Sequence, residues 1–199
     1  MAIRTILYDL GKTLVFFDFA PVYRTLVSHS GRPEGEVREV IHERYGEFCC
    51  GRMTGRQWHG YLTGSLGIST PYDEFATLWA DIFWPNEPMI ELARTLRPRY
   101  RQYLLSNTDE IHLPWCMKKF PLEPLLDGLI LSYEIGAIKP DRAIYERGLE
   151  RFGLLAGECV FIDDMPANLE GARACGIRTV ICDSAAQVRR DLASLGVTV

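Results

Sequence analysis

Short apolar runs and amphipathic segments alternate along most of this 199-residue chain. A run of three to five apolar residues that ends at a polar residue or glycine predicts a buried strand. A segment with apolar residues at every third or fourth position predicts a helix. Strands that alternate with helices indicate an α/β fold with a mainly parallel sheet and right-handed crossovers. The predicted strands lie at residues 6–8, 103–105, 128–131, 159–162 and 179–182.

The pattern changes between residues 17 and 85, where apolar positions keep a helical period and no strand is predicted. Glycine- and proline-containing turns divide this stretch into about four helices. We therefore predict an α/β core made of residues 1–16 and 86–199, with a helical unit at 17–85 inserted after the first strand. Four aromatic residues are expected to lie mostly in the core of this helical unit, with one or two of them lining a substrate pocket beneath it. They are Trp58, Trp79, Phe83 and Trp84.

Composition excludes some classes of protein. A formal charge of −4 and a pI near 5.6 argue against nucleic acid or an anionic membrane as the main partner. No apolar stretch is long enough to span a bilayer, and the first strand begins too early to leave room for a signal peptide. The six cysteines form no C-x-x-C pair, which favours a reduced, cytoplasmic protein. The oligomeric state is not predicted.

Polar residues with recognisable chemistry stand at the ends of the predicted strands. Asp9 follows the first strand and Ser106 follows a later one. The pair Asp163-Asp164 closes a third strand, and Lys139 lies in the loop after a fourth. Because ligands bind at the carboxyl ends of parallel strands, we expect these side chains to meet along one edge of the sheet.

Three carboxylates at one edge repel each other unless a cation binds them, and carboxylate oxygens suit Mg²⁺. The metal ion and Lys139 would together gather the negative oxygens of a phosphoryl group. Asp9 would attack the phosphorus and form an aspartyl-phosphate. Ser106 and Asn107 would hold the remaining oxygens, as the charge of the transition state requires.

Four motifs occur in order on the predicted elements, and together they resemble the haloacid dehalogenase superfamily. The chain is most similar to its sugar-phosphate phosphatases of the glucose-1-phosphate type and to the phosphatase domain of soluble epoxide hydrolases. The resemblance implies a Rossmann-like three-layer core with an inserted helical-bundle cap. It also implies a Mg²⁺-dependent hydrolase of small phosphate esters. The motifs are Asp9-Leu10-Gly11-Lys12-Thr13, Ser106-Asn107, Lys139-Pro140, and Asp163-Asp164 followed by Asn168.

The resemblance also implies a role for each of these residues. Asp9 is the expected nucleophile and first metal ligand, the backbone carbonyl of Gly11 the second, and Asp164 the third. Asp163 would act through a water molecule or hold the other ligands in place. The motifs further imply that Ser106, Asn107 and Lys139 contact the phosphate. Lys139 would also neutralise the charge of the nucleophile, and Asn168 would hold the loop in which it lies.

Gly11 departs from the family pattern, because most of these phosphatases carry an aspartate there that protonates the leaving group and later activates water. Proton transfer by a placed group is worth about 10²–10⁴ in rate. The sequence leaves open slow turnover, a leaving group that needs no proton, or a substitute donor from water or from the cap. All four histidines are interpreted as surface or structural residues, and among them His59 is the strongest candidate for a substitute acid or base from the cap.

Other activities remain as alternatives. A binding or regulatory protein with a weak or inactive site is the main one, because Gly11 has no acid. Dehalogenases of the family carry an aromatic residue at this position and need no metal, so that activity is disfavoured. Phosphonoacetaldehyde hydrolases use a cap lysine as a Schiff base, and residues 14–114 contain no lysine.

Overall fold

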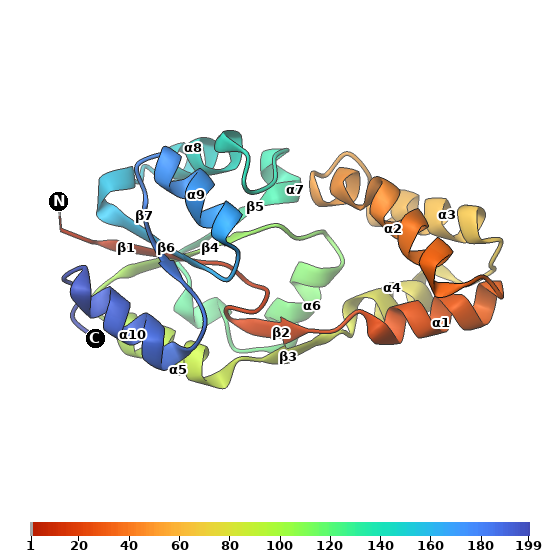
Figure 1. The fold of residues 1–199 in the computed structure, drawn as a ribbon, viewed down its shortest axis with the longest axis horizontal. Coiled ribbons are helices and arrows are strands. Elements are labelled where there is room, and N and C mark those ends of the chain that lie inside the picture. Colours follow the sequence, from red (N-terminus) through yellow and green to blue (C-terminus); the bar gives the residue numbers. More distant parts are fainter. Residues whose placement is uncertain (1) are drawn as a thin grey trace.

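A five-stranded parallel sheet forms the centre of the protein in the computed structural model, which describes residues 2–199. The strand order is β5-β4-β1-β6-β7, so the first strand of the chain lies in the middle (Figure 1). This confirms the predicted α/β fold class and the parallel direction. The strands are β1 (Thr5–Tyr8), β4 (Arg101–Ser106), β5 (Gly128–Leu131), β6 (Cys159–Asp163) and β7 (Arg178–Ile181).

Side chains of β1 alternate between two hydrophobic layers, as the pleat of a strand requires. Ile6 and Tyr8 point into a layer shared with α5, α6 and α10, whereas Leu7 points into a layer shared with α8 and α9. Both faces of the sheet are therefore covered, which gives the three layers visible in Figure 1. The helices of these layers are α5 (Glu87–Leu96), α6 (His112–Lys119), α7 (Ser132–Ile135), α8 (Arg142–Arg151), α9 (Pro166–Ala174) and α10 (Ala185–Ser194), with 3₁₀ turns at Glu123–Leu125 and Ala156–Glu158.

Four helices form a separate lobe beside the sheet (Figure 1). Their apolar faces enclose a second hydrophobic core, in which Trp58 and Trp79 are completely buried. Phe48 stacks on Trp58, and Trp58 in turn packs edge-on against Trp79. The predicted helical insertion is thus present as a packed bundle. Its helices are α1 (Ala20–Ser30), α2 (Glu34–Cys49), α3 (Gly55–Leu66) and α4 (Tyr72–Ala80).

The chain enters and leaves this lobe through a small antiparallel ribbon of β2 (Val15–Phe17) and β3 (Phe83–Pro85). The prediction of no strand between residues 17 and 85 is wrong at this point, because a three-residue strand is too short to show a period. Trp84 is also not a core residue: it lies on the outer face of the ribbon and is 49% exposed. The ribbon straddles the predicted domain limits, and the division into core and cap at residues 16/17 and 85/86 stays a prediction.

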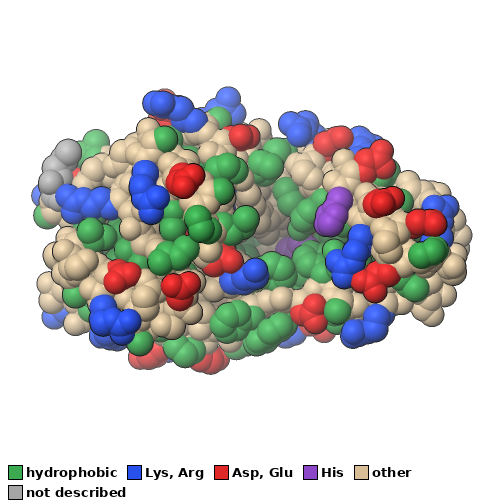
Figure 2. Space-filling model, in the orientation of Figure 1, with side chains coloured by type: hydrophobic (Ala, Val, Ile, Leu, Met, Phe, Trp, Pro, Cys, Tyr) green, Lys and Arg blue, Asp and Glu red, His purple; other side chains and the backbone are tan. Residues whose placement is uncertain are grey.

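The helical lobe faces the carboxyl ends of the strands, where the loops after β1 and β4 lie. The surface is hollowed between the two lobes, and hydrophobic side chains surround the hollow (Figure 2). Asn86 helps fix the connection, because its side-chain amide donates to the carbonyl of Thr13 at 2.9 Å instead of capping α5. The fold therefore places an inserted lobe directly over the edge where the predicted chemical groups stand.

Candidate active site

Lys139 joins two of the predicted carboxylates at the centre of the sheet edge. Its Nζ donates to Oδ1 of Asp9 at 2.6 Å and to Oδ2 of Asp163 at 2.7 Å. A third hydrogen bond goes to the carbonyl of Leu105 at 3.1 Å, so all three protons of the ammonium group have partners. The side chains of Lys139 and Asp163 are almost completely buried. Residues from three separate segments therefore meet at one point, as the strand order predicts.

The backbone of Lys139 is held by the side chain of Asn107. The amide Nδ2 of Asn107 donates to the carbonyl of Lys139 at 3.0 Å, and the N–H of Lys139 donates back to Oδ1 at 2.7 Å. This pair of bonds ties the loop after β4 to the loop before α8. Sequence reasoning expected Asn107 to contact phosphate, whereas its side chain here positions the lysine. Phosphate contact by this residue stays a prediction.

Asp163 is fixed from the opposite side by the loop after β6. Nδ2 of Asn168 lies 3.0 Å from both of its carboxylate oxygens, and the backbone N–H of Met165 donates to Oδ1 at 2.8 Å. Asn168 thus braces the loop, as predicted. With Lys139 as a further donor, every side of this carboxylate is engaged, which suits an anchoring role better than a mobile one.

The site carries more negative charge than Lys139 can balance. Burial raises the pKa of Asp9 to about 6; Lys139 opposes this rise and the charge of Asp163 adds to it. Burial and the charge of Asp163 also raise the pKa of Asp164, although the exposed Lys12 lies 3.6 Å away. Burial and carboxylate repulsion therefore both oppose ionisation at this site, and a bound cation would favour the ionised forms of these carboxylates.

A divalent cation fits this group of oxygens. Asp9, Asp163 and Asp164 each offer one carboxylate oxygen, and these three atoms lie within 4.8 Å of one another. Hard oxygen ligands with excess negative charge are what Mg²⁺ prefers. Gly11 lies beside them, in the lining of a cavity of about 170 Å³ that Asp9, Asp164 and Lys139 also line. Ligation by its carbonyl stays a prediction.

A second, smaller cavity of about 80 Å³ opens beside the first and extends under the helical lobe. Gly11, Phe17 and Asn107 line both cavities, so the two are direct neighbours. Ser106 lines the second cavity and is buried at the end of β4. The ring of Phe17 fills the space of a side chain at position 11, since a Cβ there would lie only 2.8 Å from its Cε1.

His59 is a structural residue, as interpreted from the sequence, and the alternative that it serves as a substitute acid or base in the site is not supported. Its Nε2 bonds to the carbonyl of Thr70 at 2.7 Å, and its ring packs on Phe75 inside the helical lobe. The histidine that reaches the site is His112, which lines the second cavity. Its spacing of three residues from Asp109, at the start of a helix that follows the Ser106 strand, was the sequence signal for this pair.

Both ring nitrogens of His112 bind acceptors. Nδ1 lies 2.6 Å from Oδ2 of Asp109, and Nε2 lies 2.8 Å from the carbonyl of Trp79 at the end of α4. Burial opposes ionisation of Asp109, yet His112 and two backbone N–H groups lower its pKa below the usual value. These buried contacts fasten the helical lobe to the core.

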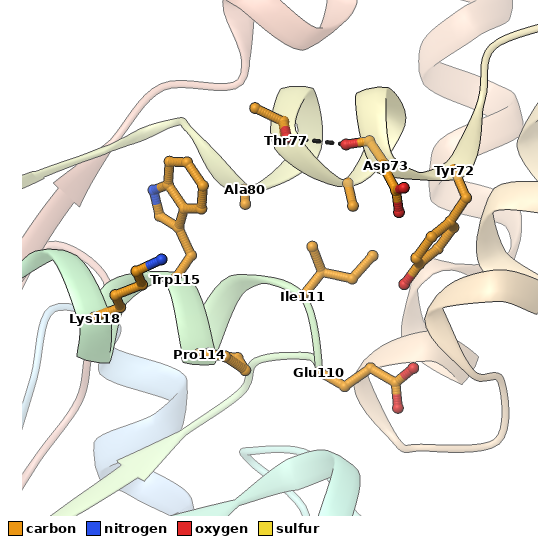
Figure 3. Close-up of a pocket in the computed structure, with 10 residues that line it drawn as sticks. Tyr72, Asp73, Thr77, Ala80, Glu110, Ile111, Pro114, Trp115 and Lys118 are labelled. Carbon is orange, nitrogen blue, oxygen red and sulfur yellow. Dashed lines mark hydrogen bonds between the residues drawn. The ribbon is translucent and has the colours of Figure 1, made fainter.

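A wider cavity of about 420 Å³ lies away from these groups, between α4 and α6 (Figure 3). Tyr72 and Ile111 point into it from opposite walls, and Trp115 closes one end. None of the predicted site residues lines it. The chemistry of the strand ends therefore belongs to the cavity of about 170 Å³, which Asp9, Asp164 and Lys139 line together.

Comparison with known proteins identifies the family. Residues 3–176 match the model of the haloacid dehalogenase-like hydrolases. Phosphatase MT3486 of Mycobacterium tuberculosis is 40% identical, over 98% of this chain and 96% of its own length. D-ribitol-5-phosphate phosphatase of Bacteroides thetaiotaomicron is 25% identical, over 96% and 97%. A crystal structure of a family enzyme from Bacteroides thetaiotaomicron, in complex with magnesium and inorganic phosphate, has a TM-score of 0.83 and 26% identity, and covers 90% of this chain and 94% of its own.

The predictions of the family, of the fold class and of a phosphoric monoester hydrolase as enzyme class are confirmed. The predicted Mg²⁺ cofactor agrees with the acidic group here and with the magnesium complexes among the structural neighbours. No helix among residues 2–199 has both the length and the apolar character needed to cross a membrane. By sequence, fold and the groups at its strand ends, the chain belongs to the haloacid dehalogenase-like hydrolase family.

Proposed function

We propose that this protein is a Mg²⁺-dependent phosphatase that hydrolyses a small phosphate monoester through an aspartyl-phosphate on Asp9. The observation that carries the proposal is the buried bridge from Lys139 to Asp9 and Asp163, beside a cavity that Asp164 also lines. A carboxylate held at the end of a central strand next to a buried ammonium group is placed to meet a dianionic phosphoryl group.

In the first step, a carboxylate oxygen of Asp9 forms a bond to phosphorus while the bond from phosphorus to the ester oxygen breaks. Lys139 holds Asp9 in its ionised form and faces the same cavity as the phosphoryl oxygens. Ser106 lies at the end of the neighbouring strand, where its hydroxyl would donate to a further oxygen. In the second step, water attacks phosphorus, releases phosphate and regenerates Asp9.

Asp9, Asp164 and the carbonyl of Gly11 would hold the metal ion, with Asp163 behind them. When bound, the ion supplies positive charge that offsets the excess of carboxylates and stabilises charge on the transferring group. Asp163 already has three donors around it, so its part in this proposal is to orient Lys139 and the loop after β6.

The helical lobe would act as the cap that closes over the site and selects the substrate. A sugar phosphate is one candidate, and the name of the relative from Bacteroides thetaiotaomicron supports that class. The proposal includes no nucleic-acid or membrane partner. It places the protein in the cytoplasm, supported by six cysteines that are all free.

The test is phosphate release from a panel of small phosphate monoesters, with Mg²⁺ and with a chelator. We expect Mg²⁺-dependent turnover that falls by at least about 10³ in Asp9→Asn, because the amide cannot attack phosphorus. Asp141→Asn is a matched control, since Asp141 is exposed and its side chain makes no cap hydrogen bond. Tight binding of a phosphate ester without turnover would instead favour the alternative of a binding or regulatory protein.

A further inference from the structure

The position of the second cavity determines where the leaving group of a substrate goes. A phosphoryl group beside Asp9 and Lys139 occupies the first cavity, and the second cavity shares Gly11, Phe17 and Asn107 with it. The ring of Phe17 occupies the space of a side chain at position 11 and forms part of the wall of both cavities. A group bonded to phosphorus that extends along this ring enters the second cavity. At about 80 Å³ this space is far smaller than the roughly 300–1,000 Å³ of a drug-sized site, and it suits a single ring.

Four aromatic side chains, Phe17, Phe19, Tyr45 and Phe83, line one part of this cavity. Phe17 packs edge-on against Phe19 at a centroid distance of 6.0 Å and also contacts Phe83 at 6.0 Å. Tyr45 from α2 completes the wall on the side of the helical lobe. Edge-to-face and offset contacts among aromatic rings are favourable beyond the area they bury. A planar apolar group thus finds matching surfaces on several sides.

Three of the polar residues that line the cavity already have partners within the protein, and the hydroxyl of the fourth, Ser106, is assigned to a phosphoryl oxygen in the proposed function. Both ends of the Asn107 amide bind the backbone of Lys139. The N–H and the carbonyl of Thr108 both bind Oγ of Ser132 at 3.0 Å. Asp109 and the carbonyl of Trp79 occupy the two nitrogens of His112. A leaving group with several hydroxyls would lose its water hydrogen bonds here and regain few of them, which disfavours binding.

The chemistry of Gly11 points in the same direction. An alcohol is a poor leaving group unless a donor protonates it, and Gly11 has no side chain to do so. Both ring nitrogens of His112 are taken up by Asp109 and by the carbonyl of Trp79, so neither is free to reach the leaving group. A phenol ionises with a pKa near 10, as tyrosine does, whereas the first proton of water has a pKa near 15.7. A phenolate can therefore leave without protonation.

From these two independent features we propose that the preferred substrates are aryl phosphates with a single-ring leaving group. The inference rests on the proposed function and names its substrate class. As Asp9 bonds to phosphorus, the phosphorus–oxygen bond breaks with its electron pair passing to the aryl oxygen. The phenolate leaves through the hollow between the lobes and takes a proton from water. Sugar phosphates are then minor substrates.

The test compares leaving groups that differ in one property at a time, using the full chain with Mg²⁺. Phenyl phosphate has a ring and a weakly basic leaving oxygen. Cyclohexyl phosphate has a ring of similar size but an alcohol oxygen, and acetyl phosphate has a good leaving group without a ring. We expect kcat/KM for phenyl phosphate to exceed that for cyclohexyl phosphate and for glucose 6-phosphate by at least about 10². Equal or higher values for either alcohol ester would overturn the proposal.

Variants of the wall separate the ring contact from the leaving-group chemistry. Phe19→Leu should lower kcat/KM for phenyl phosphate by up to about tenfold, the worth of one aromatic contact, and leave acetyl phosphate unchanged. The matched control is Phe152→Leu, because the ring of Phe152 packs on Tyr103 and lines neither cavity of the site. An equal loss on both substrates in Phe19→Leu contradicts the assignment. No turnover of any of the esters would refute the proposed function itself.

Discussion

Replacing the nucleophile should stabilise the fold while it abolishes activity. Burial raises the pKa of Asp9 from 3.8 to about 6, which means that its ionised form is less favourable in the folded protein than in the unfolded chain. An acid with a raised pKa makes the protein less stable as the pH rises from its unfolded value through its folded value. The penalty is therefore absent below about pH 4 and complete well above pH 6.

The size of the effect follows from the shift. A difference of about two pKa units corresponds to about 3 kcal/mol of unfolding free energy. For a chain of this length, 1 kcal/mol moves Tm by about 2–4 °C, so Asp9→Asn should raise Tm by about 6–12 °C at pH 8 without metal. The amide oxygen of the variant can still accept from Lys139, and Lys139 then faces one carboxylate instead of two.

The assay is thermal unfolding followed by circular dichroism in a chelating buffer at pH 5 and pH 8. The stabilisation should be smaller at pH 5, because Asp9 is then mostly protonated in the folded state. Mg²⁺ should stabilise the unmodified protein more than the variant and reduce the difference. Asp141→Asn should change Tm by little, since surface substitutions lie within about 0.5 kcal/mol. If Asp9→Asn is less stable than the unmodified protein at pH 8 in chelator, the reasoning on buried charge is refuted.

Three further variants test other parts of the site. Lys139→Met should be inactive and about 3–5 kcal/mol less stable by urea unfolding at pH 8, because two buried carboxylates lose the ammonium group that pairs with them. A stability equal to that of the unmodified protein would contradict this prediction. Gly11→Asp alone should not speed hydrolysis of cyclohexyl phosphate, because its Cβ meets the ring of Phe17, whereas Gly11→Asp with Phe17→Ala should speed it by about tenfold or more. Asp109→Asn should destabilise the protein above about pH 4, and the loss of stability should disappear as the pH falls below the lowered folded pKa of Asp109. Urea unfolding over a range of pH measures this difference in stability. A constant difference from pH 2 to 8 would contradict the prediction.

The strand-end residues were predictable because their positions depend only on the order of strands and on which end is exposed. Asp9 ends the central strand, and Asp163 ends its direct neighbour, so any parallel arrangement of these two brings them together. The helical insertion was also visible, because Trp58 and Trp79 lie at positions with a helical period. The chemistry of these residues then follows from their types.

Contacts that depend on how distant segments return to the site were not predictable. His112 becomes part of the site through the carbonyl of Trp79, which lies 33 residues earlier in a different lobe. The side chain of Asn107 turns to the backbone of Lys139, 32 residues away, and no local pattern records that choice. Trp84 is apolar yet exposed, since the short ribbon that carries it has only one covered face. Hydrophobicity alone cannot distinguish such a position from the core.

The central claim is that Asp9 accepts the phosphoryl group, and trapping the intermediate tests it most directly. Gly11 offers no base to activate water for the second step, so the aspartyl-phosphate should accumulate during turnover of phenyl phosphate with Mg²⁺. The reaction would be quenched with acid after a few turnovers, and the peptides analysed by mass spectrometry. The account predicts one phosphoryl group on the peptide that contains Asp9, and none in Asp9→Asn. Rapid phosphate release with no phosphoryl group on that peptide would contradict it.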